Sequence, residues 1–548
     1  MYMHEFLATL KSRIEGNIST DDTTRKEASR DTSLFEVLPV AVIAPTNVSD
    51  IKKIVVSAGE AQGVSITARS GGTGMDGGAL SEGVILDMTK HFSHIKGFTQ
   101  NTGTVEPGVF YRDFERESLK RGLLMPSYPA SREICTVGGM VANNSGGELT
   151  LAYGKTADYV RELKVVLSDG NEYAFSRISH EALERKLLQK DFEGDIYRRM
   201  YALVKNNQQT IQSARPHVNK NSAGYALWDV YDAQKETFDL TRLFTGSQGT
   251  LGLITEITFN LIQPDPYSQM MIVFLDSFDG LGDLVKTVLA HTPTTFESYD
   301  DKTLSLALRF FPQFLKRLGV KNLFTLLKGS LPEAWSILRH GMPKLVLQIT
   351  FDGKDAVLLK KKAEALVKEL APFKPRYVEI LKDKKEMEEY WLIRRESFNL
   401  LRHKSKHVST APFIDDIVVP PAVLSSFLPK LYSILNKYSE YMVHNIAGHI
   451  GNGNFHIIPL MDLSNPRVRE IIPEIAKQVY DLVFEYKGSS TGEHNDGMIR
   501  TPFLRQQFGD AMYTLFEETK NIFDPKNIFN PRKKVGGTLE DAMRHMHQ

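Results

Sequence analysis

The sequence predicts an α+β protein that folds into two or three domains. A chain of 548 residues is too long to fold around a single hydrophobic core. Strand-like and helix-like segments alternate near the N-terminus, and strand-like segments flank a tight turn near residue 450. Its 42% hydrophobic and 24% charged residues are ordinary for a globular chain. Helices and strands are therefore expected together, in separate lobes.

The first predicted elements surround a glycine-rich loop. We expect a strand at 41–45, a helix with Ser49 as its N-cap, and further strands at 64–68 and 83–88. Between the last two strands lies the run Arg69, Ser70, Gly71, Gly72, Thr73, Gly74 and Met75. Consecutive glycines free backbone amides to converge on an anion, although a surface turn would have the same composition. Because the loop leads into a strand and lacks Gly-Lys-Ser/Thr, it is neither a Rossmann fingerprint nor a P-loop.

Two further segments rich in small residues, 136–147 and 245–252, interrupt otherwise apolar chain. Small residues let the backbone pass close to a large, flat ligand. Three such places in one region indicate a long, extended cofactor.

The segment 449–456 predicts half of a metal site. Strand-like runs at 441–450 and 455–460 flank a Gly-Asn-Gly-Asn turn, so His449 and His456 are expected as cross-strand neighbours with Cβ atoms about 4.5–5.5 Å apart. Downstream, Glu493 and His494 add a carboxylate and a third imidazole. Two histidines and a glutamate with an open position form a catalytic metal site. A lone histidine in a turn would be an ordinary polar residue, but the combination favours the site.

Composition excludes several classes of protein. A net charge of +1 gives no field that favours nucleic acid. One cysteine, Cys135, excludes an intramolecular disulfide and an iron–sulfur cluster held by this chain's own thiolates. The N-terminus lacks the apolar core of a signal peptide, and no apolar run reaches the about 18 residues of a membrane span. The expected location is the cytoplasm.

These motifs, together with the C-terminal run 523–531, resemble the flavin-binding oxidoreductases of the vanillyl-alcohol oxidase type. Within that family they are similar to the D-2-hydroxyacid dehydrogenase branch, which includes glycolate oxidase subunits and D-lactate and D-2-hydroxyglutarate dehydrogenases. The resemblance covers nearly the whole chain. It implies a leader at 1–37, a two-lobed FAD-binding domain at 38–265, an α+β substrate cap with an antiparallel sheet at 266–500, and a segment at 501–548 that returns to the FAD domain.

The resemblance also implies which residues contact FAD. The loop from Arg69 to Met75 is similar to the family's pyrophosphate loop. Further contacts are expected from Pro126, Gly138, Gly139, Asn143, Ser145, Gly146, Gly246, Gly249, Gly252, Ile254 and Asn530. No histidine occurs in the glycine-rich loop, so the FAD is expected to be noncovalent.

The implied reaction oxidises a small D-2-hydroxy acid to the 2-oxo acid. His494 is expected as the base, His449, His456 and Glu493 as ligands of a divalent metal, and Arg394 as the clamp for the substrate carboxylate. Zinc is the expected metal, with manganese and iron as alternatives. For Arg394 the alternative is an ordinary cation on a helix surface. Electrons would pass to a separate acceptor, such as a quinone or an iron–sulfur protein.

Two other functions remain open from sequence. One is a flavin oxidase that acts on a sugar acid or lactone with oxygen as acceptor. The other is a noncatalytic flavin subunit of a larger complex. The oligomeric state is not specified by any motif.

The chain departs from the D-2-hydroxyglutarate dehydrogenases at two places. Phe398 and Ile414 stand where those enzymes carry a Thr and a Lys, which predicts a monocarboxylic substrate. The alternative is that Arg402, His403, Lys404 or Lys406 replaces the missing cation. The second departure is the pair Asn495 and Asp496 directly after His494, where the family more often has small residues. The Asp496 carboxylate could retune the base or face solvent.

One segment of the cap, 304–345, combines aromatic residues with many cations. This composition suits a peripheral surface on anionic lipid, at the inner face of the cytoplasmic membrane. Two helices packed on the cap, with their cations reaching water, are the alternative.

Overall fold

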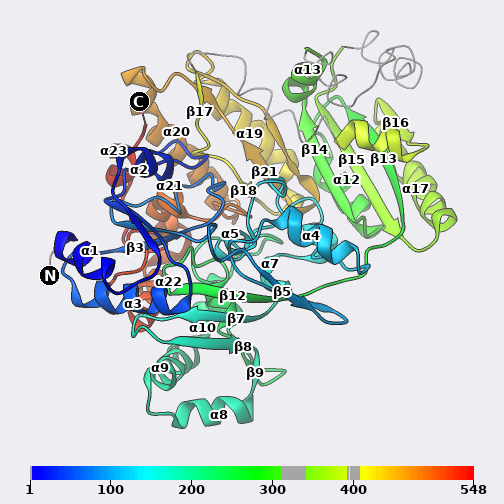
Figure 1. Ribbon diagram of the computed structural model, residues 1–548. Helices are drawn as coiled ribbons and strands as arrows, with labels where there is room; N and C mark the ends of the chain where they lie inside the picture. Colours follow the sequence, from blue (N-terminus) through cyan, green and yellow to red (C-terminus); the bar gives the residue numbers. More distant parts are fainter. Residues whose placement is uncertain (1–2, 310–340, 392–393, 395–407, 548) are drawn as a thin grey trace.

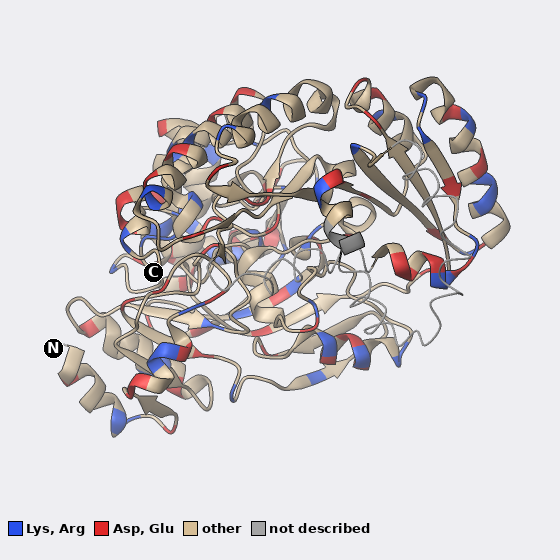
Figure 2. Ribbon diagram, turned by 90° about the horizontal axis from the view of Figure 1, so that it is seen from above, with Lys and Arg blue, Asp and Glu red and all other residues tan. Residues whose placement is uncertain are grey.

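The structure, a computed structural model, describes residues 3–309, 341–391, 394 and 408–547 (Figure 1). Sheets of four, five and three strands build the N-terminal half, and a larger, seven-stranded sheet with its helices stands on the other side of the molecule. Basic and acidic residues are interspersed along the helices in Figure 2, in agreement with the net charge of +1.

The first lobe is a four-stranded sheet in the order β1-β2-β4-β3. Its elements are β1 (Asn17–Ser19), β2 (Ala41–Ala44), β3 (Ile66–Arg69), β4 (Val84–Asp87) and the helix α3 (Val48–Glu60). Strand β4 pairs in parallel with both β2 and β3. Asn47, not the expected Ser49, caps α3, because its side chain accepts a hydrogen bond from the Asp50 amide.

The N-terminal residues, expected to form a leader at 1–37, pack against this lobe. Strand β1 pairs antiparallel with β2. In the helix α1 (Met3–Lys11), Phe6 and Leu10 are fully buried in one cluster with Ile43 and Ile51.

The second lobe is a five-stranded antiparallel sheet in the order β5-β6-β12-β7-β8. Its strands are β5 (Ile95–Phe98), β6 (Thr102–Val105), β7 (Val160–Val166), β8 (Glu172–Ser176) and β12 (Leu253–Asn260). Side chains of β12 alternate between buried and partly exposed positions, as expected for a sheet that packs through one face. Helices α9 (Phe192–Asn206) and α10 (Gln208–Ala214) contact α22 (Leu504–Phe523), which comes from the C-terminal part of the chain.

The C-terminal half is built on a seven-stranded antiparallel sheet in the order β16-β13-β15-β14-β20-β21-β18. These strands are β13 (Tyr267–Leu275), β14 (Thr295–Asp300), β15 (Leu345–Gly353), β16 (Tyr377–Ile380), β18 (Ile417–Val418), β20 (Ile446–His449) and β21 (Asn454–Ile457). The helices α12 (Leu281–Ala290), α17 (Ala356–Leu370), α19 (Leu424–Asn436) and α20 (Pro466–Glu485) pack with it around one large hydrophobic cluster.

The histidine hairpin has a different register from the expected one. His456 lies opposite Ala447, and His449 lies opposite Asn454. A 3₁₀ turn takes up Ile450–Asn452, and Gly453 adopts a φ of 67°. The two histidines are therefore diagonal and not direct cross-strand partners. Because Ala447 and His449 are two residues apart on one strand, both imidazoles still share a face, with ring centroids 5.2 Å apart.

The C-terminal segment lies against the first lobe. Phe529 forms a parallel bridge with Ile66 of β3, and the amide of Asn530 donates to the Ile66 carbonyl at 2.9 Å. Among the described helices, none combines the length and apolar character that crossing a bilayer requires. Most of segment 304–345 lies outside the described residues, so its membrane contact stays a prediction.

The buried N-terminal helix gives a stability prediction. Phe6→Ala should lower the free energy of unfolding by about 3–5 kcal/mol, because a fully buried aromatic side chain leaves a cavity. Thermal unfolding of the purified protein measures the effect. Lys11→Ala, at an exposed position of the same helix, is the control. Equal midpoints for the two variants would show that this helix does not support the lobe.

Candidate functional site

A cavity of about 540 Å³ runs between the glycine-rich loop and the histidine cluster. This volume is typical of small-molecule and cofactor sites. Of the residues expected from sequence, the following line it: Ser70, Gly71, Gly72, Thr73, Gly74, Met75, Gly138, Gly139, Asn143, Ser145, Gly249, Gly252, Ile254, Arg394, His449, His456, Glu493 and His494. Segments separated by hundreds of residues therefore meet at one cavity.

The glycines along this cavity fit an extended ligand such as FAD. A Cβ atom on Gly71 would lie 2.9 Å from the Ile134 carbonyl oxygen, and one on Gly138 would lie 2.5 Å from the Cβ of Pro107. Gly72 has a φ of 63°, which L side chains rarely adopt. The backbone is therefore packed tightly behind the cavity wall, and no side chain from these positions fills the space in front of it.

Five expected cofactor residues do not line the cavity: Arg69, Pro126, Gly146, Gly246 and Asn530. The side-chain amide of Asn530 donates to the carbonyls of Gly78 and Gln248 at 2.8 and 2.7 Å. It therefore links two segments of the cavity wall without lining the cavity itself. Gly246 accepts a hydrogen bond from Asn495 at 2.9 Å, and Gly146 packs against the Glu493 side chain. Asn530, Gly246 and Gly146 therefore lie behind the residues that line the cavity, and not at its surface as the family resemblance implied.

The predicted metal ligands do come together. One ligand atom from each of His449, His456 and Glu493 lies within 4.8 Å of the others. The Nε2 atom of His449 is 3.1 Å from Oε1 of Glu493. His494 stacks on His456 with ring centroids 5.1 Å apart. Two imidazoles and a carboxylate at this spacing fit a divalent transition-metal ion, and His494 lies beside them.

Two buried carboxylates orient these histidines, and neither was predicted from sequence. Glu297 Oε1 lies 2.7 Å from Nδ1 of His449. Asp415 lies 2.6 Å from Nδ1 of His494 and 3.3 Å from Nδ1 of His456. A carboxylate acceptor keeps the proton on Nδ1, so Nε2 of each ring is the nitrogen that can bind a metal or accept a proton. No local signal singled out Glu297, because its strand, Thr295–Asp300, is mostly polar in sequence although it is buried in the structure.

Asp416, next to Asp415, fixes the loop that carries Glu493 and His494. Its Oδ2 atom accepts from the backbone amides of Glu493 and His494 at 2.8 and 2.7 Å, and from the Thr491 hydroxyl at 2.6 Å. Asp416 itself has a φ of 68°. Asp415 therefore orients the His494 side chain, and Asp416 fixes the backbone of the same loop.

Buried charges set the protonation of the cluster. Burial raises the pKa of Glu493, but the neighbouring Lys220 and His449 outweigh it and hold that pKa well below its usual range. Lys220 is fully buried and pairs directly with the Glu493 carboxylate. Burial lowers the pKa of His494, yet the charges of Asp415 and Asp416 raise it to about 9. Without a metal ion, Glu493 is therefore ionised and His494 is an imidazolium.

Arg394 lies inside the site and not on a helix surface, which excludes the alternative considered from sequence. It is 7% exposed, and its Nε lies 3.2 Å from Oε2 of Glu297. The cavity wall also includes Trp391, Ile458 and Leu460. Ile414 belongs to the hydrophobic core and does not line the cavity. Phe398, Arg402, His403, Lys404 and Lys406 lie outside the described residues.

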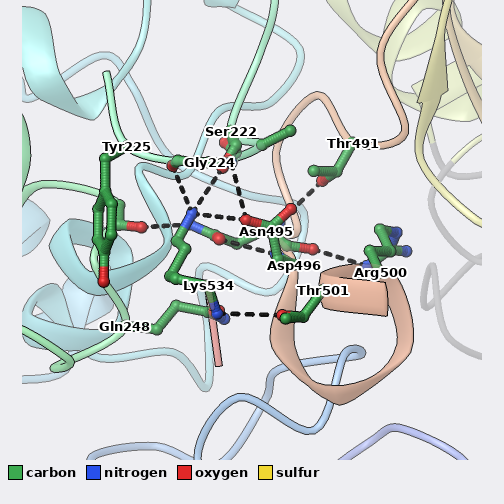
Figure 3. Close-up of polar contacts among 12 residues, drawn as sticks. Ser222, Gly224, Tyr225, Gln248, Thr491, Asn495, Asp496, Arg500, Thr501 and Lys534 are labelled. Carbon is green, nitrogen blue, oxygen red and sulfur yellow. Dashed lines mark hydrogen bonds and ion pairs between the residues drawn. The ribbon is translucent and has the colours of Figure 1, made fainter. Parts of the chain in front are cut away.

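Asp496 does not face solvent, and its carboxylate lies beside Lys534 (Figure 3). It pairs with Lys534 at 2.8 Å, and Lys534 also donates to the carbonyls of Ser222 and Gly224 at 2.9 and 2.8 Å. Both charged side chains are fully buried. The pair joins the functional loop to the second lobe and to the C-terminal segment.

Comparison with known families matches both halves of the chain. Residues 39–176 match the FAD binding domain, and residues 265–534 match the C-terminal domain of FAD linked oxidases. The D-2-hydroxyglutarate dehydrogenase of Pseudomonas putida is 27% identical over 538 residues, which are 96% of this chain and 51% of that protein. This chain thus spans about half the length of that relative.

Shorter relatives match over most of their length. The glycolate oxidase subunit GlcD of Bacillus subtilis is 28% identical over 92% of this chain and 90% of its own. The D-lactate dehydrogenase of Archaeoglobus fulgidus is 26% identical over 90% and 91% of the two chains.

Solved structures share the fold at low identity. A 4-ethylphenol oxidase from Gulosibacter chungangensis superposes with a TM-score of 0.67 and 16% identity, covering 98% of each chain. A p-cresol methylhydroxylase gives a TM-score of 0.68 and 14% identity, covering 98% of this chain and 97% of its own. With both domain models matched in order, around a cavity that fits the cofactor, the chain belongs to the FAD-linked oxidases, with their FAD-binding domain followed by their C-terminal domain.

Proposed function

We propose that the protein is an FAD-dependent D-2-hydroxyacid dehydrogenase that also requires a divalent metal. The observation that carries this proposal is the convergence of His449, His456, Glu493, His494 and Arg394 on the cavity lined by the glycine-rich loop. Two of the relatives are named for the D-2-hydroxy acids that they oxidise, D-2-hydroxyglutarate and D-lactate, and these names support a D-2-hydroxy acid as the substrate. A noncatalytic flavin subunit would have no use for this set of side chains.

Each residue has a role in the proposed oxidation. Arg394 binds the substrate carboxylate, for which a planar guanidinium suits two parallel hydrogen bonds. His494 removes the hydroxyl proton at Nε2, while Asp415 stabilises the imidazolium that forms. The α-hydrogen leaves with its electron pair as the carbonyl forms. FAD, when bound, supplies the acceptor for this hydride.

The metal would be held by His449, His456 and Glu493, with zinc proposed and manganese or iron as alternatives. A divalent ion there would bind the hydroxyl and carboxylate oxygens, lower the hydroxyl pKa, and offset the carboxylate charges that raise the pKa of His494. Electrons then leave for a separate acceptor, such as a quinone or an iron–sulfur protein.

Removing one metal ligand should abolish turnover without removing FAD. We expect His449→Ala, His456→Ala and Glu493→Gln each to lose bound metal and most activity in dye-linked assays. Glutamine at 493 preserves the packing against Gly146, so the flavin site should stay intact. Metal analysis and flavin absorbance measure the two contents. The control is His444→Ala, a buried histidine of the same domain that does not line the cavity; normal metal and turnover in a ligand variant would remove that residue from the site.

His494 should behave differently from the ligands. His494→Gln is expected to keep most of the metal and the FAD, yet to slow reduction of the flavin by substrate about 100- to 10,000-fold, because the general base is missing. Anaerobic stopped-flow absorbance measures this rate. A variant that reduces its flavin at the normal rate would show that another group removes the proton.

The cavity wall predicts the side chain of the substrate. Because Ile458 and Leu460 offer no partner for a second carboxylate, D-lactate should be preferred over D-2-hydroxyglutarate by at least about tenfold in kcat/KM. Ile458→Lys should narrow this ratio, since it adds an ammonium to the same wall. Flavin reduction by both acids provides the measurement. A faster reaction with D-2-hydroxyglutarate in the unmodified protein would show that the distal acid has another cationic partner.

A further inference from the structure

We propose that Glu297 is a positioning residue that couples the carboxylate clamp Arg394 to the metal ligand His449. This inference rests on the proposed function of the site. Nothing in the sequence motif around the histidines includes this residue, which lies about 150 residues upstream of the hairpin.

The geometry of Glu297 divides its two oxygens between two functional side chains. Oε1 lies 2.7 Å from Nδ1 of His449, and Oε2 lies 3.2 Å from Nε of Arg394. Glu297 is 1% exposed. Its strand β14 pairs with β20 through Ser298 and Gly448, which places the carboxylate beside the histidine that ends β20.

A buried carboxylate in this position has to keep both partners. Losing either one would leave an oxygen of this buried carboxylate unpaired, which is unfavourable. The orientation of Arg394 is therefore linked to that of His449. The link continues from His449 to Glu493 and from Glu493 to Lys220, so cations and acids alternate through the whole cluster.

Asp415 shows why Glu297 is different. Asp415 also contacts two functional side chains, but both are imidazoles: the proposed metal ligand His456 and the proposed base His494. Glu297 instead contacts one imidazole and the guanidinium that would hold the substrate acid. It is thus placed to make metal binding and carboxylate binding depend on one another.

The same strand offers a matched control in Asp300. This carboxylate is fully buried, and it accepts from the Tyr432 hydroxyl at 3.1 Å and from the Ile446 amide at 3.0 Å. It does not line the cavity. Asp300→Asn therefore removes a buried negative charge from β14 without touching the clamp or the ligands.

The experiment compares Glu297→Gln with Asp300→Asn in FAD-loaded protein. Zinc affinity is measured by competition with a chelator, and carboxylate binding by the change in flavin absorbance on titration with pyruvate. We expect Glu297→Gln to weaken zinc binding about 10- to 100-fold and pyruvate binding at saturating zinc about tenfold, with a larger effect on KM than on kcat for D-lactate. Both affinities should stay within about twofold in Asp300→Asn.

A second variant keeps the test independent of folding. Glu297→Asp retains the charge but is one methylene shorter, so it should restore at most one of the two affinities. A loss confined to zinc, or to pyruvate, in Glu297→Gln would overturn the coupling, as would two unchanged affinities. If zinc and pyruvate binding fall together although no 2-hydroxy acid is oxidised, the coupling holds and the proposed reaction fails. Unmodified protein that binds neither probe would overturn both.

Discussion

The hydrogen bonds to the Asp416 carboxylate determine where Glu493 and His494 lie. Two consecutive backbone amides and a threonine hydroxyl converge on one oxygen of this buried acid. The other end of the same loop is held by the buried pair of Asp496 and Lys534. Breaking a buried pair by removing one partner typically costs about 3–5 kcal/mol. The loop is therefore fixed at both ends before any ligand arrives, and little ordering is left for ligand binding to impose.

Charge balance explains why the cluster accommodates so many acids. Glu297, Glu493, Asp415 and Asp416 are all buried within one small region. Lys220 and Arg394 neutralise part of this charge through direct pairs. The two histidines with raised pKa values, His449 and His494, and the buried Arg500 add further positive charge. A bound divalent metal ion would neutralise these acids in place of the protonated histidines. His494 could then become neutral and accept a proton.

Sequence reasoning found the residues that stand in local motifs and missed those that act through distant pairings. His449, His456, Glu493 and His494 could be predicted because a turn and a short polar loop carry them. Glu297, Asp415 and Lys220 could not, because their partners lie 152, 79 and 273 residues away. The predicted register of the histidine hairpin was wrong because residues Ile450–Asn452 form a 3₁₀ helix. Asn530 belongs to the predicted signature, yet its contacts depend on how two remote loops meet.

The pairing of Phe529 with Ile66 has a consequence for how the protein is made. Strand β3 emerges from the ribosome early, but its bridge partner is synthesised more than 450 residues later. Domains generally fold in order from the N-terminus during translation. Here the first lobe cannot complete its edge until the segment around residue 529 has been synthesised, so FAD capture should follow synthesis of the C-terminal domain.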